Sequence, residues 1–415
     1  MELVAAEKLV SQIEAQVSGE PRLVVAGNCA APATLLRSIG ETLAAGRLFS
    51  LNAPVGWPQR EGLVNETPFV GAGTRGDPSL EYLPMRLSLV PRLFTTSRPP
   101  DVVVLHVAPP RGDKVSMGIE VSILPAAVEA VRARGGLVVA QVNAAMPYTF
   151  GEGELPTDWI DLAAEVDEPL VTHAVPPADG AEQCIGEQIA QMVQDGATLQ
   201  LGIGAIPDAV AVHLQTRQHL GVWSEMISDG TLSLERAGAL DPDRPLTASF
   251  VSGSDELYRW VDGNPRIWMR RTEVINDPAR VAAHPGMVSI NTAMQVDLFA
   301  QANAMFIHGR VHSGFGGQPD FVAGALHSRG GHAIIALRSW HDRSGTSTVL
   351  PVLSHPVTSF QHSAIVSEHG LAKIFGRSEQ MQARALIDHV ADPRARDELH
   401  ESVGRFAELE GAPLE

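Results

Sequence analysis

The amino-acid sequence predicts an α/β fold made of two similar domains, each with a largely parallel sheet. The chain has 415 residues, more than a single hydrophobic core usually organises. Short apolar runs alternate with amphipathic stretches from end to end, as strands and helices do in α/β domains. A segment rich in Pro, Gly and Asp, residues 172–183, divides the chain near its middle. We therefore predict one domain over residues 1–180 and a second over residues 181–415.

Six segments have the composition of buried strands, because they are short, β-branched or Leu-rich, and bounded by Gly, Pro or Asp. They are residues 22–27, 101–107, 136–142, 197–203, 304–309 and 332–337. Between some of them, residues 123–135 and 182–196 place apolar residues three and four apart and end in Gly, which indicates amphipathic helices. Strands that are apolar throughout and separated by helices predict a parallel sheet covered on both faces.

The two halves share a short pattern of a strand, a Gly-containing turn, a Pro and a helix. It occurs at residues 23–36 and again at residues 199–212, with Gly27 and Gly202 in corresponding positions. Two copies of one α/β unit explain this pattern, although a match this short also arises by chance.

Composition excludes several classes of protein. A net charge of -17 opposes non-specific binding to nucleic acid or to an anionic membrane, since such binding needs clustered Lys and Arg. The two cysteines, Cys29 and Cys184, form no CxxC pair, which fits a reducing cytosol rather than a disulfide framework. The N-terminus lacks the pattern of a signal peptide, and no apolar run approaches the roughly 20 residues that span a bilayer. We expect a cytoplasmic protein without nucleic-acid or membrane partners.

One carboxylate, Glu225, lies in the mostly apolar stretch GVWSEMISDG, residues 221–230, ahead of an Asp-Gly turn. Taken alone, it is more typical of a solvated side chain than of a nucleophile. The only metal-like spacing is that of His308 and His312, which have no HExxH pattern or carboxylate partner, so we expect no metal site. A GxSxG elbow is also missing, which gives a Ser-His-Asp hydrolase little support.

Three glycine-rich segments are candidates for contact with a ligand. Residues 71–76, GAGTRG, match GxGxxG but have no strand before and no helix directly after, so a plain loop is the better interpretation. In residues 199–210, a strand leads into Gly202 and Gly204 and then a helix start, whose N-H groups favour an anion; a simple strand-to-helix turn is the alternative. Residues 312–321, HSGFGGQPDF, fit either a close backbone approach to a ligand or a tight connection.

Several longer stretches, in order, resemble the acetyl-CoA hydrolase/transferase group of the family I coenzyme A transferases. They are DGATLQLGIGAIPDAV (195–210), LGVWSEMISDG (220–230), VSINTAMQVDLFAQANA (288–304) and SGFGGQPDFVAGALHSRGGHAIIAL (313–337), with VAPPRGDKVSMGIEVS (107–122) and NAAMPYTFGE (143–152) in the first half. The resemblance covers nearly the whole chain. It implies two CoA-transferase domains with the active site at their interface.

The resemblance also implies a ping-pong reaction on a glutamate, and Glu225 occupies the place of the family nucleophile. The carboxylate attacks an acyl-CoA, a glutamyl-CoA thioester follows, and a free carboxylate takes up the CoA. Coenzyme A is then a substrate, and no tightly bound cofactor is needed. For the oxyanions, the resemblance assigns the backbone N-H of Ile206 and that of Gly316 or Gly317. A homodimer is expected by analogy.

Further contacts to substrate or CoA are expected within the same segments. They are Gly202, Gly204, Trp223, Asn291, Gly314 and Gln318, together with the basic residues Arg329 and Lys373, and Arg377 as another candidate. The chain departs from the family pattern at Trp223 and, near the C-terminus, at Ser363 and His369. These departures leave open the acyl group, the acceptor and two alternatives: a thioester hydrolase on the same scaffold, or a non-catalytic acyl-CoA-binding protein.

Overall fold

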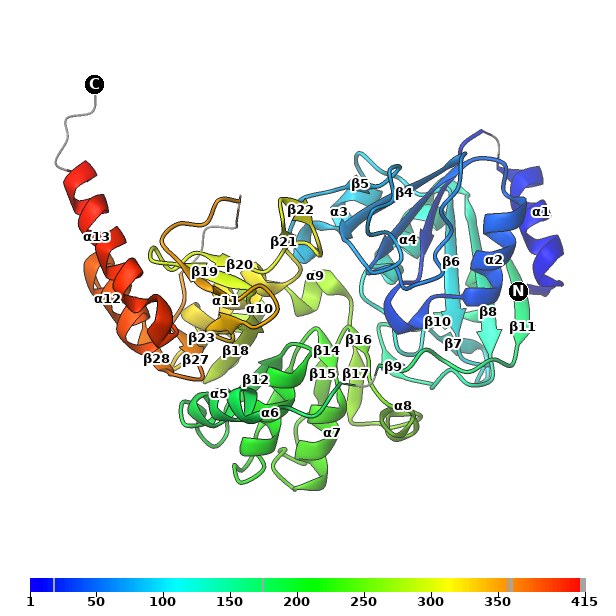
Figure 1. Cartoon of the computed structure of the whole chain (residues 1–415). Helices are drawn as coiled ribbons and strands as arrows, with labels where there is room; N and C mark the ends of the chain where they lie inside the picture. Colours follow the sequence, from blue (N-terminus) through cyan, green and yellow to red (C-terminus); the bar gives the residue numbers. More distant parts are fainter. Residues whose placement is uncertain (18, 174, 356, 358–360, 411–415) are drawn as a thin grey trace.

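Two sheets, one in each half of the chain, form the framework of the protein (Figure 1). The computed structural model describes residues 1–410 except residues 18, 174, 356 and 358–360. Within these residues, the first sheet has eight strands in the order β1-β11-β8-β6-β2-β3-β4-β5, all paired in parallel. The predicted α/β class with largely parallel sheets is confirmed.

The first half places its helices on both faces of this sheet. Its strands are β1 (Glu2–Leu3), β2 (Arg22–Val25), β3 (Gly46–Leu51), β4 (Leu63–Phe69), β5 (Glu81–Tyr82), β6 (Val102–Val107), β8 (Leu137–Asn143) and β11 (Leu162–Val166), with a small β7 (Lys114–Ser116) and β10 (Glu154–Pro156) ladder. Its helices are α1 (Ala6–Gln16), α2 (Ala33–Thr42), α3 (Pro91–Phe94) and α4 (Leu124–Arg134). Along β2, Leu23 and Val25 pack with α1 and α2, while Val24 faces the core shared with α4.

The second sheet is likewise parallel, except at one edge. Among the described residues, it has nine strands in the order β28-β27-β23-β18-β12-β13-β15-β17-β9, and only β27 and β28 pair antiparallel. These strands are β9 (Phe150–Gly151), β12 (Thr198–Leu201), β13 (Gly221–Trp223), β15 (Leu246–Ala248), β17 (Ile267–Met269), β18 (Met287–Thr292), β23 (His332–Ala336), β27 (Ala364–Ser367) and β28 (Gly370–Lys373). The strand β9 belongs to the first half of the chain.

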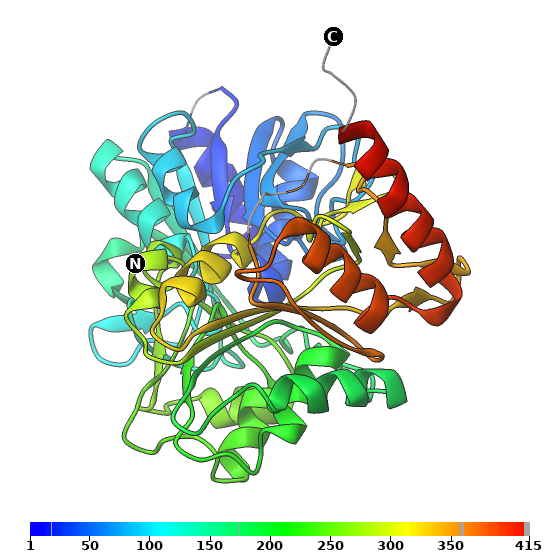
Figure 2. The same ribbon diagram turned by 90° about the vertical axis from the view of Figure 1, so that its left-hand side faces the viewer.

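Helices cover this sheet as well. They are α5 (Gly180–Ala190), α6 (Ala205–His213), α7 (Asp229–Arg236), α8 (Asp255–Val261), α9 (Thr272–Ile275), α10 (Pro278–Ala282), α11 (Gln318–His327), α12 (Glu379–His389) and α13 (Arg396–Glu410). In Figure 1, α5, α6 and α7 lie below the sheet, α10 and α11 above it, and α12 and α13 beyond β27 and β28. Figure 2 shows the blue strands and helices of the first half above the green segments of the second half, with the red α13 at the right.

Short ladders and hairpins complete the second half. Their strands are β14 (Met226–Ile227), β16 (Phe250–Val251), β19 (Gln295–Asp297), β20 (Ala302–Asn303), β21 (Phe306–Ile307), β22 (Arg310–Val311), β24 (Trp340–His341), β25 (Thr346–Ser347) and β26 (Val349–Leu350). The prediction of one buried strand over residues 304–309 is wrong. His308 and Gly309 have φ of 48° and 75°, as a two-residue hairpin turn requires, so β21 turns back onto β22.

The other predicted elements are found. Residues 22–27, 101–107, 197–203 and 332–337 contain β2, β6, β12 and β23, and residues 123–135 contain α4. The strand predicted over residues 136–142 is β8, which continues one residue further, to Asn143. The helix predicted over residues 182–196 is α5, which begins earlier, where Asp179 and Glu182 form a capping box, and ends at Ala190. The strand, turn and helix order of β2 and α2 recurs in β12 and α6.

The two halves share one core and are tied together by backbone pairing. The largest cluster of buried apolar side chains runs from Val24 and Leu105 in the first half to Leu199 and Val288 in the second. The strand β9 pairs in parallel with β17, and Glu120 makes an isolated bridge to Phe250. The division into domains at residue 180 therefore stays a prediction, because the sheets do not separate cleanly there.

A buried ion cluster on the first sheet generates the first testable prediction. Glu66 on β4 is 1% exposed and pairs with Arg22, Arg47 and Arg98. Burial raises its pKa, but the hydrogen bonds from Arg22 and Arg47 outweigh burial and hold the pKa below the ordinary 4.5. The resulting stabilisation is present above pH 4.5 and is lost as the pH falls through the lowered folded-state pKa.

We expect Glu66→Gln to lower the free energy of unfolding by about 3 kcal/mol near pH 7, since it removes the buried carboxylate and leaves the largely buried Arg22 without its ion-pair partner. Urea unfolding measures this change. The matched control is Glu81→Gln, because Glu81 pairs with Arg47 and Arg98 but its side chain is 40% exposed; we expect it to cost about 1 kcal/mol or less. Equal effects of the two substitutions would contradict the role given to burial.

Candidate active site

A cavity of about 570 Å³ lies between the two halves of the chain, and both contribute to its wall. Asn28 and Asn52 follow β2 and β3 of the first sheet, while Gly202 and Ser249 follow β12 and β15 of the second. Each of these residues comes directly after the carboxyl end of a parallel strand, or shortly beyond it, where α/β sheets place their ligands. The cavity is therefore the candidate site.

Glu225 lies on the wall of this cavity, in the short segment between β13 and β14. Its backbone carbonyl accepts hydrogen bonds of 2.9 Å from the N-H groups of Ser249 and Phe250. The preceding Ser224 donates its hydroxyl to the carbonyl of Leu201 at 3.2 Å. These bonds attach the segment to the ends of two neighbouring strands, so the carboxylate projects from a fixed backbone.

The surroundings of the Glu225 carboxylate disfavour its charge. Burial raises its pKa to about 7, the charges of Asp320 and Glu120 also raise the pKa, and the hydrogen bond from Asn276 lowers it. Asn276 donates its amide N-H to Oε1 of Glu225. It is itself fully buried, and its Oδ1 has no hydrogen-bond partner among the described residues. Glu225 is thus a half-buried carboxylate whose charged form is disfavoured by its surroundings.

The loop with Gly314, Gly316 and Gly317 is packed between Glu225 and the first half of the chain. A Cβ on Gly317 would lie 1.6 Å from Oε1 of Glu225, and one on Gly314 would lie 2.4 Å from the carbonyl oxygen of Pro68. Gly316 has a φ of 57°. The glycines allow this close approach, which explains their density better than a tight connection does. Gly314, Gly316 and Gly317 all line the cavity.

The turn into α6 borders the same cavity. Gly202 lines it, and Gly204, with a φ of 114°, precedes the helix. Ile206 lies in the first turn of α6, where backbone N-H groups have no acceptor within the helix. Its side chain is buried in the shared core. The N-H of Ile206 is therefore available to a ligand, as a donor to an oxyanion must be. Its role as that donor stays a prediction.

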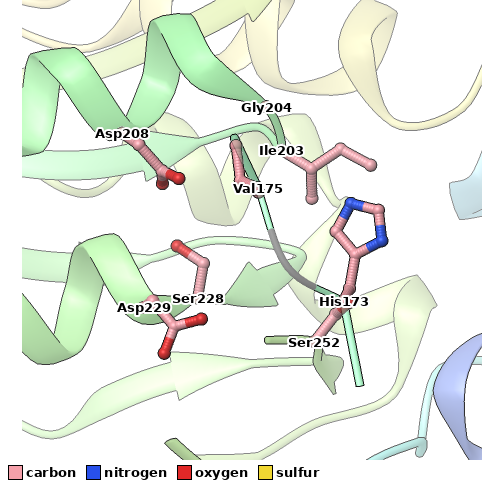
Figure 3. A pocket seen from close by; sticks show the side chains of 8 residues that line it. All are labelled: His173, Val175, Ile203, Gly204, Asp208, Ser228, Asp229 and Ser252. Atoms are coloured by element: carbon pink, nitrogen blue, oxygen red, sulfur yellow. The ribbon is translucent and has the colours of Figure 1, made fainter. Parts of the chain in front are cut away.

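A smaller pocket adjoins the cavity at the start of α6 and α7 and shares His173, Ile203 and Ser252 with it (Figure 3). Asp208 and Asp229 reach into it from the two helices. Burial raises the pKa of Asp208 to about 6, the charge of Asp229 raises it further, and His173 lowers it. Among the described residues, no group of three or more His, Cys, Asp or Glu side chains is arranged to hold a metal ion.

The remaining predicted residues divide into two groups. Asn291 and Gln318 line the cavity, and Nε2 of Gln318 has no hydrogen-bond partner among the described residues. Trp223, Arg329 and Lys373 are not among the described residues on the cavity wall. Their assignment to substrate or CoA contacts thus gains no support from the structure.

Each predicted residue that lies away from the cavity wall has a physical reason for its position. The Trp223 side chain packs in the apolar cluster with α10 and α11 and donates its indole N-H to the carbonyl of Ile275 at 3.0 Å. Arg329 follows the end of α11, while the glycine loop lies at the start of that helix. Lys373 is exposed at the end of the edge strand β28, and the half-buried Arg377 follows it by four residues.

Several polar residues of the site were not predicted from the sequence. Asn276 holds the nucleophile candidate, and Asp320, on α11, accepts hydrogen bonds from both the hydroxyl and the backbone N-H of Ser88 across the two halves. Glu120 is 2% exposed and accepts a hydrogen bond of 2.5 Å from Asn28. Arg75 lines the cavity and lies in the loop of residues 71–76, for which the sequence predicts no contact with a ligand. Only its Gly-rich surroundings signalled a close approach.

Comparison with known proteins places the chain among enzymes that act on CoA thioesters. The family profile described as "Acetyl-CoA hydrolase/transferase C-terminal domain" matches residues 253–403. The chain is 34% identical to 4-hydroxybutyrate coenzyme A transferase of Clostridium kluyveri, over 96% of each chain. It is 32% identical to succinyl-CoA:acetate/propanoyl-CoA:succinate CoA transferase of Fasciola hepatica, over 94% of this chain and 85% of that one. RipA from Yersinia pestis is similar in structure, with a TM-score of 0.90 and 26% identity over 98% of both chains.

The burial of Glu225 predicts a measurable cost to stability. A carboxyl whose folded-state pKa is raised from 4.5 to about 7 opposes folding as the pH rises through that range, because the folded state must release a proton from an unfavourable site. We expect Glu225→Gln to raise the free energy of unfolding by about 1–3 kcal/mol at pH 8 and by less at pH 5.

Urea unfolding at the two pH values measures this difference. The matched control is Glu165→Gln, because Glu165 is an exposed residue of β11; we expect it to change the free energy of unfolding by less than about 0.5 kcal/mol. A Glu225→Gln protein that is no more stable than the wild type at pH 8 would contradict the raised pKa.

Proposed function

The chain belongs to the acetyl-CoA hydrolase/transferase family, and from this premise we propose that it moves coenzyme A between an acyl-CoA and a free carboxylate through a covalent intermediate on Glu225. The observation that carries the proposal is the position of this carboxylate. It lies on the wall of a cavity between two α/β units, accepts a hydrogen bond from Asn276, and has its pKa raised to about 7. A half-buried carboxylate whose pKa lies near neutral pH suits a nucleophile.

The proposed reaction conserves the energy of the thioester. An oxygen of Glu225 attacks the acyl carbonyl, the carbon-sulfur bond breaks, and a mixed anhydride and CoA thiolate form. The thiolate attacks the glutamyl carbonyl and displaces the first acid, which leaves a glutamyl-CoA thioester. An incoming carboxylate then reverses both steps and leaves as the new acyl-CoA. No net water or proton is consumed, which makes exclusion of water the main requirement.

Two oxyanions form in this sequence, and each needs donors that are already in place. We propose that the N-H of Gly316 or Gly317 serves the acyl side, since a Cβ on Gly317 would overlap the Glu225 carboxylate and so marks the closest approach of backbone to the nucleophile. For the glutamyl side we propose the N-H of Ile206 in the first turn of α6. Gly202, Asn291, Gly314 and Gln318 contact the substrate in this proposal.

Hydrolysis on the same scaffold is the nearest alternative, because the family name itself covers hydrolases and transferases. A hydrolase and a transferase of this kind differ only in the second substrate. In hydrolysis, water attacks the covalent intermediate; in transfer, a carboxylate does. Dependence of the rate on an added carboxylate separates them. The non-catalytic alternative has less support, since the Glu225, Asn276 and Gly317 contacts are present and the curated relatives reported above are named enzymes.

The proposal also covers the location, the oligomeric state and the partners of the protein. Within the described residues, no helix has both the length and the apolar character for crossing a bilayer. The cytoplasmic location and the homodimer stay predictions from the composition and from the family resemblance. Acyl-CoA and a small carboxylate are the proposed partners, with no metal and no tightly bound cofactor.

The covalent intermediate is the direct test of this function. After incubation with a short acyl-CoA, we expect the intact mass of the wild type to increase by one CoA minus water, because the glutamyl-CoA thioester retains CoA. Glu225→Ala should show no adduct. Glu165→Gln is the matched control, since Glu165 is an exposed carboxyl of β11 that does not line the cavity; it should keep the adduct. An adduct that persists in Glu225→Ala, or none in the wild type with any acyl-CoA, would overturn the mechanism.

The rate of adduct formation should also depend on pH. The attacking form of Glu225 is the carboxylate, so the rate should rise with pH, with a midpoint near the raised pKa of about 7, and level off above it. Asp320→Asn should move the midpoint to lower pH, because the charge of Asp320 contributes to raising the pKa of Glu225. Rapid-mixing mass spectrometry between pH 5.5 and 9 measures both curves. A rate independent of pH in this range would contradict the assignment of the nucleophile.

A further inference from the structure

One guanidinium lies on the wall of the cavity without a carboxylate partner. Among the described residues that line the cavity, Arg75 is the one Lys or Arg. It comes from the loop of residues 71–76, in which a Cβ on Gly71 or Gly73 would overlap the backbone of Ala53 or Pro54, at 2.2 Å and 1.8 Å. The glycines let this loop lie flat against the cavity wall, which fixes the start of the Arg75 side chain.

Arg75 also joins the two halves of the protein. Its Nε donates a hydrogen bond of 2.9 Å to the backbone carbonyl of His312, which directly precedes the glycine loop of the second half. Burial lowers the pKa of Arg75 and of His312, and the charge of Arg75 lowers that of His312 further. Within the described part of the chain, the pKa of Arg75 is shifted by burial without a contribution from any carboxylate, and its side chain donates to a backbone carbonyl. The terminal N-H groups of its guanidinium are left for another acceptor.

The charge and the position of Arg75 define the ligand group that it fits. A guanidinium binds phosphate or carboxylate through paired N-H donors, and a chain with a net charge of -17 needs a local cation to hold a polyanion. Arg75 is exposed, at the mouth of the cavity, whereas Gly317 touches Glu225. The five Cα-to-Cα steps from His312 to Gly317 span at most about 18 Å, a distance that the pantetheine arm of CoA can bridge.

We propose that Arg75 binds a phosphate group of coenzyme A, and that its hydrogen bond to His312 couples this contact to the position of the glycine loop beside Glu225. The inference rests on the proposed function for the identity of the ligand. The reacting acid is too close to Glu225 to be the group that Arg75 holds at the mouth. Binding energy gained far from the thioester is then used to place Gly316 and Gly317, so that loss of the phosphate contact lowers kcat as well as raising KM.

The test compares two donors, an acyl-CoA and the same acyl group on pantetheine, in the wild type, Arg75→Ala and Arg75→Lys. With acyl-CoA, Arg75→Ala should lower kcat/KM about tenfold, the effect of one hydrogen-bonded charge pair, with part of the loss in kcat. Arg75→Lys should recover part of it, because it keeps the charge but not the paired donors. With acyl-pantetheine, which has no phosphate, Arg75→Ala should lose much less, because only the hydrogen bond to His312 is removed. Arg37→Ala is the matched control, since Arg37 is an exposed residue of α2 in the same half.

Three results would overturn the inference. One is an equal loss with acyl-pantetheine, which would mean that Arg75 only supports the loop. Another is a rise in KM for the acceptor carboxylate alone, which would make the acid its ligand. The third is no loss with either donor. If the wild type transfers nothing, the proposed function fails instead, and calorimetry with CoA and pantetheine still decides whether Arg75 binds the phosphate end.

Discussion

The structure is organised around one unfavourable placement, a carboxylate held where its charge is poorly solvated. Glu225 lies on the wall of the cavity between the halves, and burial raises its pKa to about 7. Such a group destabilises the fold, as active-site groups commonly do, and it stays in place because the surrounding structure holds it there. Asn276 donates to its Oε1, and Ser249 and Phe250 hold its backbone carbonyl. The chemistry proposed for Glu225 and its cost to stability have the same physical origin.

Exclusion of water from this place requires both halves of the chain. The glycine loop fills the space between Glu225 and the Pro68 to Phe69 backbone, and it can do so only because it lacks side chains at three positions. Asp320 and Ser88 link the same two regions by two hydrogen bonds. The loop is thus packed against the first half at Gly314 and against the Glu225 carboxylate at Gly317. Neither half encloses the cavity alone.

The sequence predicted the elements and the nucleophile candidate better than it predicted the wall of the site. Apolar runs identified β2, β6, β8, β12 and β23, because a buried parallel strand has a composition of its own. They failed at residues 304–309, where His308 and Gly309 adopt left-handed angles and make a hairpin. Local composition does not reveal that His308 takes such a conformation.

The side chains of the site show the same limit. Family resemblance led to Glu225 and the glycine loop, both of which lie at the cavity. Proximity in sequence was misleading for Trp223, which is two residues from Glu225 yet packs against α10 and α11. Asn276 and Arg75 reach the site through tertiary contacts with residues far away in the chain. A single sequence does not encode those distances in any local pattern.

The strand β9 has a wider consequence for how this protein can move and how it can be divided. Although it belongs to the first half, it completes the edge of the second sheet beside β17. Cutting the chain in the middle would leave β17 as a bare edge with the exposed Trp268 on it, a template for aggregation. A hinge opening of the halves would have to break the same ladder. The edge that the second sheet needs is thus supplied by the first half of the chain, and separate expression of the second half would have to replace it.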